Sequence, residues 1–190
     1  NELKNKFGKN VIFFENLSKY SWFNLGGPAE VLFKPESTEQ LIDFLKYVNN
    51  SEKIICLGAG SNTLIRDGGF GGIVIKLSPN FSYMKLIEKN VLEVGAGTLD
   101  KTLSRYAEEK SIMNFEFLSC IPGPVGGAIK RNSGCYGNEI SNILLSLKAV
   151  DLNGNLIEIK SFEIEVQPQY NLLQKTMMMA EGVARQLNPK

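Results

Sequence analysis

The sequence contains no histidine, and this absence removes several kinds of chemistry at once. Neither a Ser-His-Asp nor a Cys-His nucleophile can be assembled within the chain, and the same holds for a His-ligated metal site. The charges nearly cancel, with 21 Lys and Arg against 20 Asp and Glu. No overall field therefore attracts nucleic acid or an anionic membrane. We expect no nucleic-acid partner, no metal site, and chemistry based on a bound cofactor or on carboxylate, Lys, Tyr, Ser or Cys side chains.

Cysteine is scarce, and long apolar runs are missing. Cys56, Cys120 and Cys135 are widely spaced without a CxxC motif, which predicts neither a disulfide framework nor a zinc site. Their apolar or Gly-rich neighbours predict buried, reduced thiols. No stretch approaches the ~18 apolar residues that span a bilayer, and residues 1–9 do not resemble a signal peptide. We expect a cytoplasmic protein with no membrane contact and no obligate protein partner.

The composition that remains is typical of a globular domain, with 43% apolar and 22% charged residues in 190. In the first part, strands are predicted at residues 29–34, 53–57 and 73–77, the second of them short and buried. Between the first two, a helix over residues 37–50 begins at Ser37, with Gln40 completing a capping box. This order predicts a βαβ-type unit.

The second part has the pattern of an antiparallel sheet with helices. A helix is expected to open at Thr98, and Asn153-Gly154 predicts a type I′ hairpin. Met177-Met178-Met179 is a further strand candidate. We therefore predict an α+β chain of two parts, residues 1–78 and 79–190. Strands of the second part are predicted at residues 83–87, 91–96, 149–152 and 156–159.

A first glycine-rich loop, Leu57-Gly-Ala-Gly-Ser-Asn-Thr63, directly follows a predicted strand. Small residues with free N–H groups in this position can form a concave anion-binding nest, which would suit a diphosphate. The loop lacks the GK[ST] of a P-loop, and Thr63 stands where the dinucleotide fingerprint needs a third glycine. An ordinary tight turn remains an equal alternative for this loop taken alone.

A second glycine-rich stretch covers residues 121–137, of which nearly half are Gly or Pro. A loop this long is functional or disordered, and its interleaved apolar residues Ile121, Val125, Ala128 and Ile129 argue against disorder. Its backbone is expected to wrap a flat or extended ligand. Two such stretches in one short chain favour a nucleotide-like ligand.

The motifs LGAGSNTLIRDGGFGGIVI (57–75), IPGPVGGA (121–128) and NSGCYGNEI (132–140) occur in one order. Together with FNLGGPA (23–29), they closely resemble the UDP-N-acetylenolpyruvoylglucosamine reductase (MurB) family. The resemblance implies a PCMH-type FAD-binding fold of two subdomains and non-covalent FAD. It also implies NADPH-dependent reduction of the enolpyruvyl ether of a UDP-sugar to UDP-N-acetylmuramate, for peptidoglycan synthesis and cell-wall biogenesis. The alternatives are another PCMH-fold flavin oxidase, or a nucleotide-binding module without catalysis.

The resemblance also implies which residues hold the cofactor. The first loop would bind the FAD diphosphate, and the second stretch would line the flavin and its ribityl chain, with Tyr136 near the flavin or simply a half-buried aromatic. The first set is Leu57, Gly58, Ala59, Gly60, Ser61, Asn62 and Thr63. The second set is Ile121, Pro122, Gly123, Gly126, Gly127, Ala128, Asn132, Gly134 and Tyr136.

The catalytic residues of the family are not found. The arginine expected next to Tyr170 is replaced by Asn171, and the family's serine and glutamate would lie beyond Lys190. The C-terminal substrate domain is thus expected to be missing and the chain as given inactive or incomplete. Either the sequence is a fragment or the chain has lost these groups. The first is favoured because the FAD motifs are intact.

Overall fold

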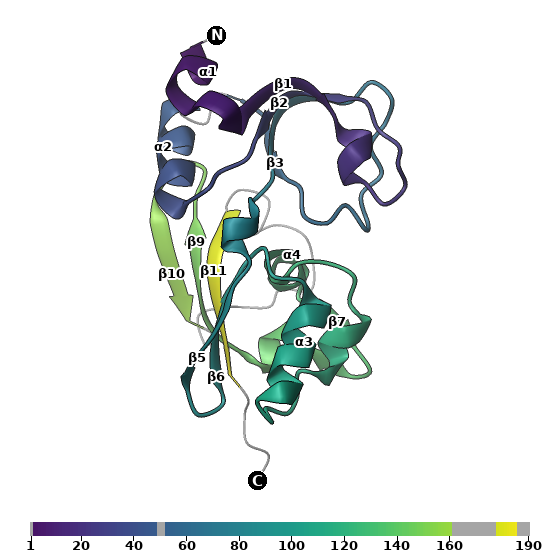
Figure 1. Ribbon diagram of the computed structural model, residues 1–190, viewed down its shortest axis with the longest axis vertical. Coiled ribbons are helices and arrows are strands. Elements are labelled where there is room, and N and C mark those ends of the chain that lie inside the picture. Colours follow the sequence, from purple (N-terminus) through teal and green to yellow (C-terminus); the bar gives the residue numbers. More distant parts are fainter. Residues whose placement is uncertain (1, 49–51, 161–177, 186–190) are drawn as a thin grey trace. The chain divides into compact units, whose positions relative to one another are not determined.

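The computed structural model describes residues 2–48, 52–160 and 178–185. The chain divides into two compact units. Unit 1 runs to Asn80 and includes Leu152–Gly154, whereas unit 2 contains Phe81–Asp151 and the chain from Asn155 onward. Each unit has its own sheet (Figure 1). No helix among the described residues is long and apolar enough to cross a membrane.

Unit 1 contains a four-stranded sheet of order β1-β2-β4-β3. Strand β2 pairs antiparallel with β1 and parallel with β4, and β4 pairs parallel with β3. The chain passes from β2 through helix α2 to β3, so the predicted βαβ-type unit is confirmed. The elements are α1 (Glu2–Phe7), β1 (Val11–Asn16), β2 (Pro28–Phe33), α2 (Thr38–Val48), β3 (Ile54–Cys56) and β4 (Phe70–Ile75).

Helix α2 begins where the sequence predicts it. The backbone N–H of Gln40 donates to Ser37 Oγ over 3.2 Å, so Ser37 caps the helix as expected. The reciprocal half of the capping box differs, because Gln40 Oε1 accepts from the backbone N–H of Glu36 at 2.7 Å. The same oxygen accepts from Asn10 Nδ2 at 2.8 Å, which ties the helix start to the chain just before β1.

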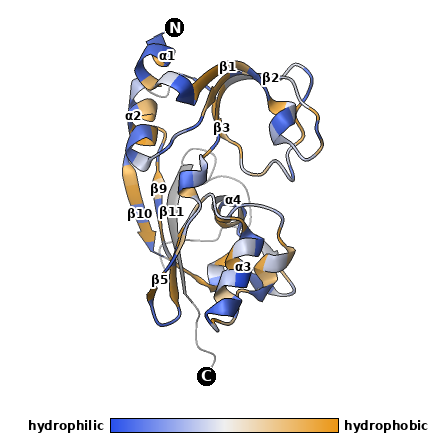
Figure 2. Ribbon diagram, viewed as in Figure 1, coloured by the Kyte–Doolittle hydropathy of each residue, from blue (hydrophilic) through white to orange (hydrophobic). Residues whose placement is uncertain are grey.

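The core of unit 1 lies between α2 and the sheet. Phe44 of α2 stacks on Phe33 of β2 at a centroid distance of 3.7 Å, and both rings are fully buried. In Figure 2, α2 carries both blue and orange, as expected for an amphipathic helix. One prediction is wrong here: β3 is an edge strand, with Ile55 37% exposed and Cys56 exposed, because it pairs on one side only.

Unit 2 contains a five-stranded antiparallel sheet of order β10-β9-β11-β6-β5. The predicted antiparallel sheet is confirmed, and the strand candidate at the three methionines corresponds to β11, which lies centrally between β9 and β6. Strand β9 begins earlier than predicted. The elements are β5 (Met84–Glu88), β6 (Val91–Gly95), α3 (Asp100–Glu109), α4 (Val125–Arg131), β7 (Gly134–Cys135), β8 (Asn138–Glu139), β9 (Leu144–Val150), β10 (Leu156–Lys160) and β11 (Met178–Arg185).

Two local predictions in this part of the chain are corrected. Helix α3 does not open at Thr98, because Thr98 Oγ1 donates to the carbonyl of Tyr83 at 3.0 Å instead of capping the helix. The β9–β10 connection is not a two-residue type I′ turn, since only Gly154 has a positive φ (+77°). Its loop is closed by Asp151, whose Oδ1 accepts from the backbone N–H of Asn155 at 2.8 Å.

Candidate functional site

The first glycine-rich loop leaves β3 at the carboxyl edge of the parallel strands, and its carbonyl groups are held by the protein. Gly58 O accepts from Lys76 Nζ at 2.7 Å, and Gly60 O accepts from the backbone N–H of Trp22 at 3.1 Å. In a trans peptide, the N–H of the next residue points away from the carbonyl. The N–H groups of Ala59 and Ser61 therefore lie on the side opposite these two anchors. A left-handed residue between them, Gly60 at φ +69°, is typical of an anion-binding nest.

Gly60 is required by the fold itself. A Cβ at this position would lie 2.0 Å from the backbone oxygen of Tyr20 and 2.9 Å from Ser21 Cα. The close approach that the sequence predicts is thus an approach to the protein's own backbone.

The glycines of the FNLGGPA motif hold the loop pair together, a role that the sequence alone does not indicate. The N–H groups of Gly27 and Gly69 both donate to Arg66 O at 2.9 Å. A Cβ at Gly27 would lie 1.9 Å from Asp67 O, and one at Gly69 would lie 1.9 Å from Pro28 O. Residues 20–28 and 58–69 therefore form one interlocked pair of loops.

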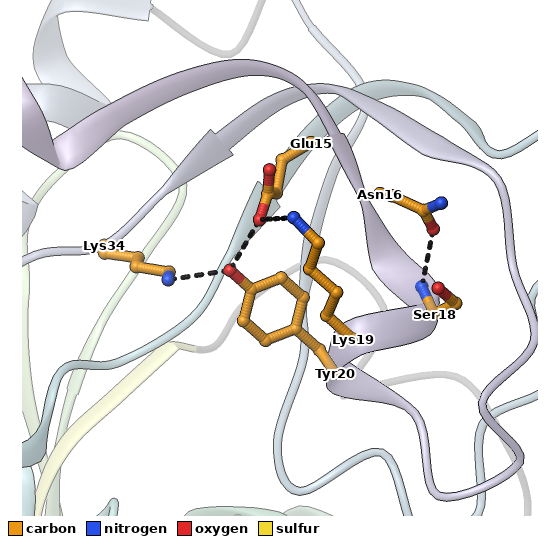
Figure 3. A network of polar contacts seen from close by, with 6 residues as sticks. All are labelled: Glu15, Asn16, Ser18, Lys19, Tyr20 and Lys34. Carbon is orange, nitrogen blue, oxygen red and sulfur yellow. Dashed lines mark hydrogen bonds and ion pairs between the residues drawn. The ribbon is translucent and has the colours of Figure 1, made fainter.

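Two ammonium groups lie beside this pair of loops. Lys34 Nζ donates to Tyr20 Oη at 2.8 Å, and Tyr20 Oη donates to Glu15 Oε1 at 3.0 Å (Figure 3). Lys76 Nζ lies 5.7 Å from the Tyr20 ring centroid. Burial, reinforced by repulsion from Lys34, lowers the pKa of Lys76.

The carboxylate of Glu15 offsets part of this positive charge. Burial acts to raise its pKa, but hydrogen bonds from Tyr20 and Lys19 and the charge of Lys34 lower it overall. Lys34 and Lys76, together with the nest, give this part of unit 1 the donors and charge that an anion needs.

The second glycine-rich stretch is not a loop throughout, and this prediction is corrected. Residues 125–131 form α4, and Gly134–Cys135 with Asn138–Glu139 form a hairpin. Helix α4 tolerates two glycines because its first N–H groups have partners in the turn between β6 and α3. Val125 N donates to Thr98 O at 2.8 Å and Gly126 N to Ala96 O at 2.9 Å.

The two glycines of α4 differ in what surrounds them. A Cβ on Gly126 would lie 3.1 Å from both Cβ and O of Ala96, so close packing explains this glycine. Gly127 is exposed, and its nearest neighbour would be the ring of Pro124 at 3.7 Å, an ordinary contact. A helix is weakened by about 1 kcal/mol by glycine relative to alanine. Nothing around Gly127 in the described chain explains that cost, whereas a ligand lying on α4 would.

The chain after α4 lines an open concavity of 580 Å³. Asn132 ends the helix at φ +44°, and its Oδ1 accepts from the backbone N–H of Ser141 at 2.9 Å. Tyr136 (φ +53°) and Gly137 (φ +81°) form the tip of the hairpin, with Tyr136 86% exposed. Its exposure excludes a half-buried aromatic. The lining residues are Asn132, Gly134, Cys135, Tyr136, Gly137, Asn138, Glu139 and Asn142.

A buried carboxyl that the sequence does not indicate lies next to this stretch. Asp100 is completely buried, and neither carboxyl oxygen has a hydrogen-bond partner. Burial raises its pKa to about 8, so the group is largely protonated at neutral pH. Its backbone N–H donates to Gly123 O at 2.9 Å, which places the neutral acid next to the second stretch. An acidic residue at a helix start gives no signal of such burial.

The predicted cofactor residues therefore fall into two sets. Leu57–Thr63 lie together in unit 1, and Ile121–Tyr136 lie together in unit 2. Within the second set, Asn132, Gly134 and Tyr136 share the concavity. Tyr170, where the family arginine was sought, lies outside the described residues. Among the described residues no group of three His, Cys, Asp or Glu side chains could hold a metal ion.

The FAD binding domain model matches residues 29–160, which include both sets. The chain belongs to this FAD binding domain family. It is 41% identical over 177 residues to the UDP-N-acetylenolpyruvoylglucosamine reductase of Pelagibacter ubique, covering 93% of this chain and 59% of that protein. It is 39% identical over 160 residues to the Caulobacter sp. enzyme of the same name, covering 84% and 52%. The predicted family resemblance is confirmed, and the chain spans little more than half the length of these relatives.

Solved structures support the same assignment of fold. The crystal structure of UDP-N-acetylenolpyruvylglucosamine reductase (MurB) from Thermus caldophilus matches at TM-score 0.71 and 27% identity, covering 92% of this chain and 60% of that one. p-Cresol methylhydroxylase with substrate bound matches at TM-score 0.66 and 16% identity, over 96% of this chain and 41% of that one, which shows the fold alone. The predicted PCMH-type α+β fold is confirmed.

A UbiB helical domain model also matches residues 152–190. The described residues within that range form β10 and β11 and include no helix. The structure therefore gives this second match no support.

Proposed function

We propose that this chain is the FAD-binding part of a UDP-N-acetylenolpyruvoylglucosamine reductase. In this proposal, NADPH reduces the enolpyruvyl ether of UDP-N-acetylglucosamine to UDP-N-acetylmuramate in cytoplasmic peptidoglycan precursor synthesis. The observation that carries it is the 41% identity over 177 residues, which include both glycine-rich stretches. When bound, FAD would supply the hydride transfer between NADPH and the sugar.

The residues present fit a non-covalently held FAD. In unit 1, the nest from Gly58 to Asn62 would take the diphosphate, because the carbonyls of Gly58 and Gly60 already accept from Lys76 and Trp22 on the opposite side of the loop. In unit 2, Gly127 leaves backbone uncovered on α4, and the hairpin offers an open, polar concavity. Tyr170, next to which the family's arginine was sought, lies outside the described residues. Activity on the sugar is thus a proposal for the whole protein.

The site assignment is tested at Gly127. Replacement by leucine puts an apolar side chain on an exposed face of α4 without crowding the protein. Leucine is also a better helix former than glycine. We expect thermal stability to be equal or higher. FAD affinity, measured by titration with flavin fluorescence, should fall at least tenfold, or about 1.4 kcal/mol. Glu108→Leu, at an exposed position of helix α3 outside both cofactor sets, is the control for an added surface leucine. FAD binding equal to wild type in Gly127→Leu contradicts the placement.

The reaction is tested separately from the site. NADPH oxidation is followed in the FAD-loaded protein with and without the enolpyruvyl sugar. In a reductase, the sugar accelerates the oxidation of NADPH and is itself reduced. In an oxidase, the oxidation of NADPH continues with oxygen as the only electron acceptor. We expect the 190-residue chain to bind FAD and to reduce the sugar hardly at all, and the same assay on the full reading frame to show turnover.

A further inference from the structure

Cys120 immediately precedes the second glycine-rich stretch, Cys135 lies near its end, and the elements that carry them are in contact. Cys120 ends the 3₁₀ turn η4 (Glu116–Cys120), and Cys135 lies in β7, which packs against η4. The Cys120 thiol lies close enough to the Cys135 thiol to raise its pKa. Neither thiol is disulfide-bonded. The sequence predicts that both are buried, but Cys120 is exposed and Cys135 is half-buried.

The hydrogen bonds around the pair give the two thiols different roles. Ser119 Oγ donates its single hydrogen to Glu116 O at 2.7 Å, so toward Cys120, 3.7 Å from its sulfur, it can only accept. Partial burial, and then the neighbouring Cys120, raise the pKa of Cys135, which keeps it protonated. Cys120 is the exposed member that a dissolved oxidant meets first.

We propose that Cys120 and Cys135 form a dithiol oxidation site, which hydrogen peroxide converts to an intramolecular disulfide across residues 120–135. The Cys120 thiolate attacks peroxide, the O–O bond breaks, one water is formed, and Cys120 becomes a sulfenic acid. The Cys135 sulfur then attacks the Cys120 sulfur; the S–S bond forms, the S–O bond breaks, and a second water leaves with the Cys135 proton. In total, two thiols lose two electrons and two protons, and one peroxide is reduced to two waters.

The folded geometry makes this pair selective. A disulfide needs Cβ atoms about 3.5–4.5 Å apart. The packing of β7 against η4 brings the segments that carry the two cysteines together, so only a local adjustment is needed. Cys56 is equally exposed but belongs to unit 1, whereas the proposed pair belongs to unit 2. Cys56 is therefore the internal control for simple exposure.

Trypsin separates the three cysteines, because their peptides are bounded by Lys53 and Arg66, by Lys110 and Lys130, and by Arg131 and Lys148. The folded chain is treated with one equivalent of hydrogen peroxide, and remaining thiols are blocked with N-ethylmaleimide in denaturant before digestion and mass spectrometry. We expect peptide 111–130 linked to peptide 132–148, lighter than their sum by two hydrogen atoms, with peptide 54–66 carrying the label. Dithiothreitol should restore both peptides. The 120–135 link should exceed any link to Cys56 at least tenfold.

Two variants and one control keep the proposal falsifiable. In Cys135→Ser, the sulfenic acid on Cys120 has no partner and should be trapped by dimedone. In Cys120→Ser, labelling of Cys135 by dimedone should be at least tenfold weaker. Oxidation in urea should abolish the preference for the 120–135 link. Equal oxidation of all three thiols in the folded chain, or a 120–135 link that forms only in urea, overturns the proposal.

Discussion

Gly60→Ala is the substitution for which the structure makes the sharpest prediction. The new Cβ would lie 2.0 Å from the carbonyl oxygen of Tyr20, and the residue must keep φ near +69°. The left-handed conformation costs a non-glycine residue about 1–2 kcal/mol. Forcing a methyl group into packed backbone costs about 1–3 kcal/mol more. We expect the free energy of unfolding to fall by about 2–5 kcal/mol, a large share of the ~5–15 kcal/mol typical of a domain.

The chain contains its own reporter for this experiment. Trp22 is the single tryptophan, and its backbone N–H donates to Gly60 O at 3.1 Å. Its fluorescence during urea unfolding therefore follows the interlocked loops directly. Gly68→Ala is the matched control, because a Cβ there meets no atom within 4 Å and its φ is not in the left-handed region. We expect that control to stay within about 0.5 kcal/mol of wild type.

The two variants together decide between a glycine needed by the fold and one needed only by a ligand. Sequence reasoning alone predicts that a substitution at Gly60 removes FAD and leaves the fold intact. The structure predicts lost stability in the absence of FAD. If Gly60→Ala unfolds at the same urea concentration as Gly68→Ala without cofactor, the close approach of Tyr20 to Gly60 is wrong.

Three further substitutions test the site and the fold. Lys76→Met removes the donor to Gly58 O, so FAD affinity in a fluorescence titration should fall by about tenfold (~1.4 kcal/mol), with partial recovery in Lys76→Arg. Asp100 has a folded pKa of about 8 against an ordinary 3.8, so the unfolded chain loses its proton first. Stability should fall between about pH 4 and pH 8, by up to ~1.4 kcal/mol per pH unit, and urea unfolding of Asp100→Asn should lack this slope. Ser37→Ala removes the bond from Gln40 N and should cost about 1 kcal/mol in the same assay.

The parts of the fold that the sequence predicts well are those with a local, periodic signal. Alternating or continuous apolar runs identify most strands of both sheets, and the apolar face of residues 41–48 identifies α2. Helix α4 was missed because Pro124, Gly126 and Gly127 are all poor helix formers. Its stability comes from N–H bonds to Thr98 O and Ala96 O, which lie nearly thirty residues earlier in the chain. No local pattern contains those partners.

The candidate site is also predicted only in part from the sequence. The glycine motifs locate both cofactor segments, but they do not tell why each glycine is there. Gly60 and Gly69 are glycines because the backbones of residues 20–28 approach them, and Gly126 because Ala96 does. A glycine that has open space around it and lies inside a helix, as Gly127 does, lacks an explanation within the described chain and points to a bound ligand. That distinction depends on which segments meet in space, and it selects Gly127, not Gly60 or Gly126, as the position at which to test where FAD lies.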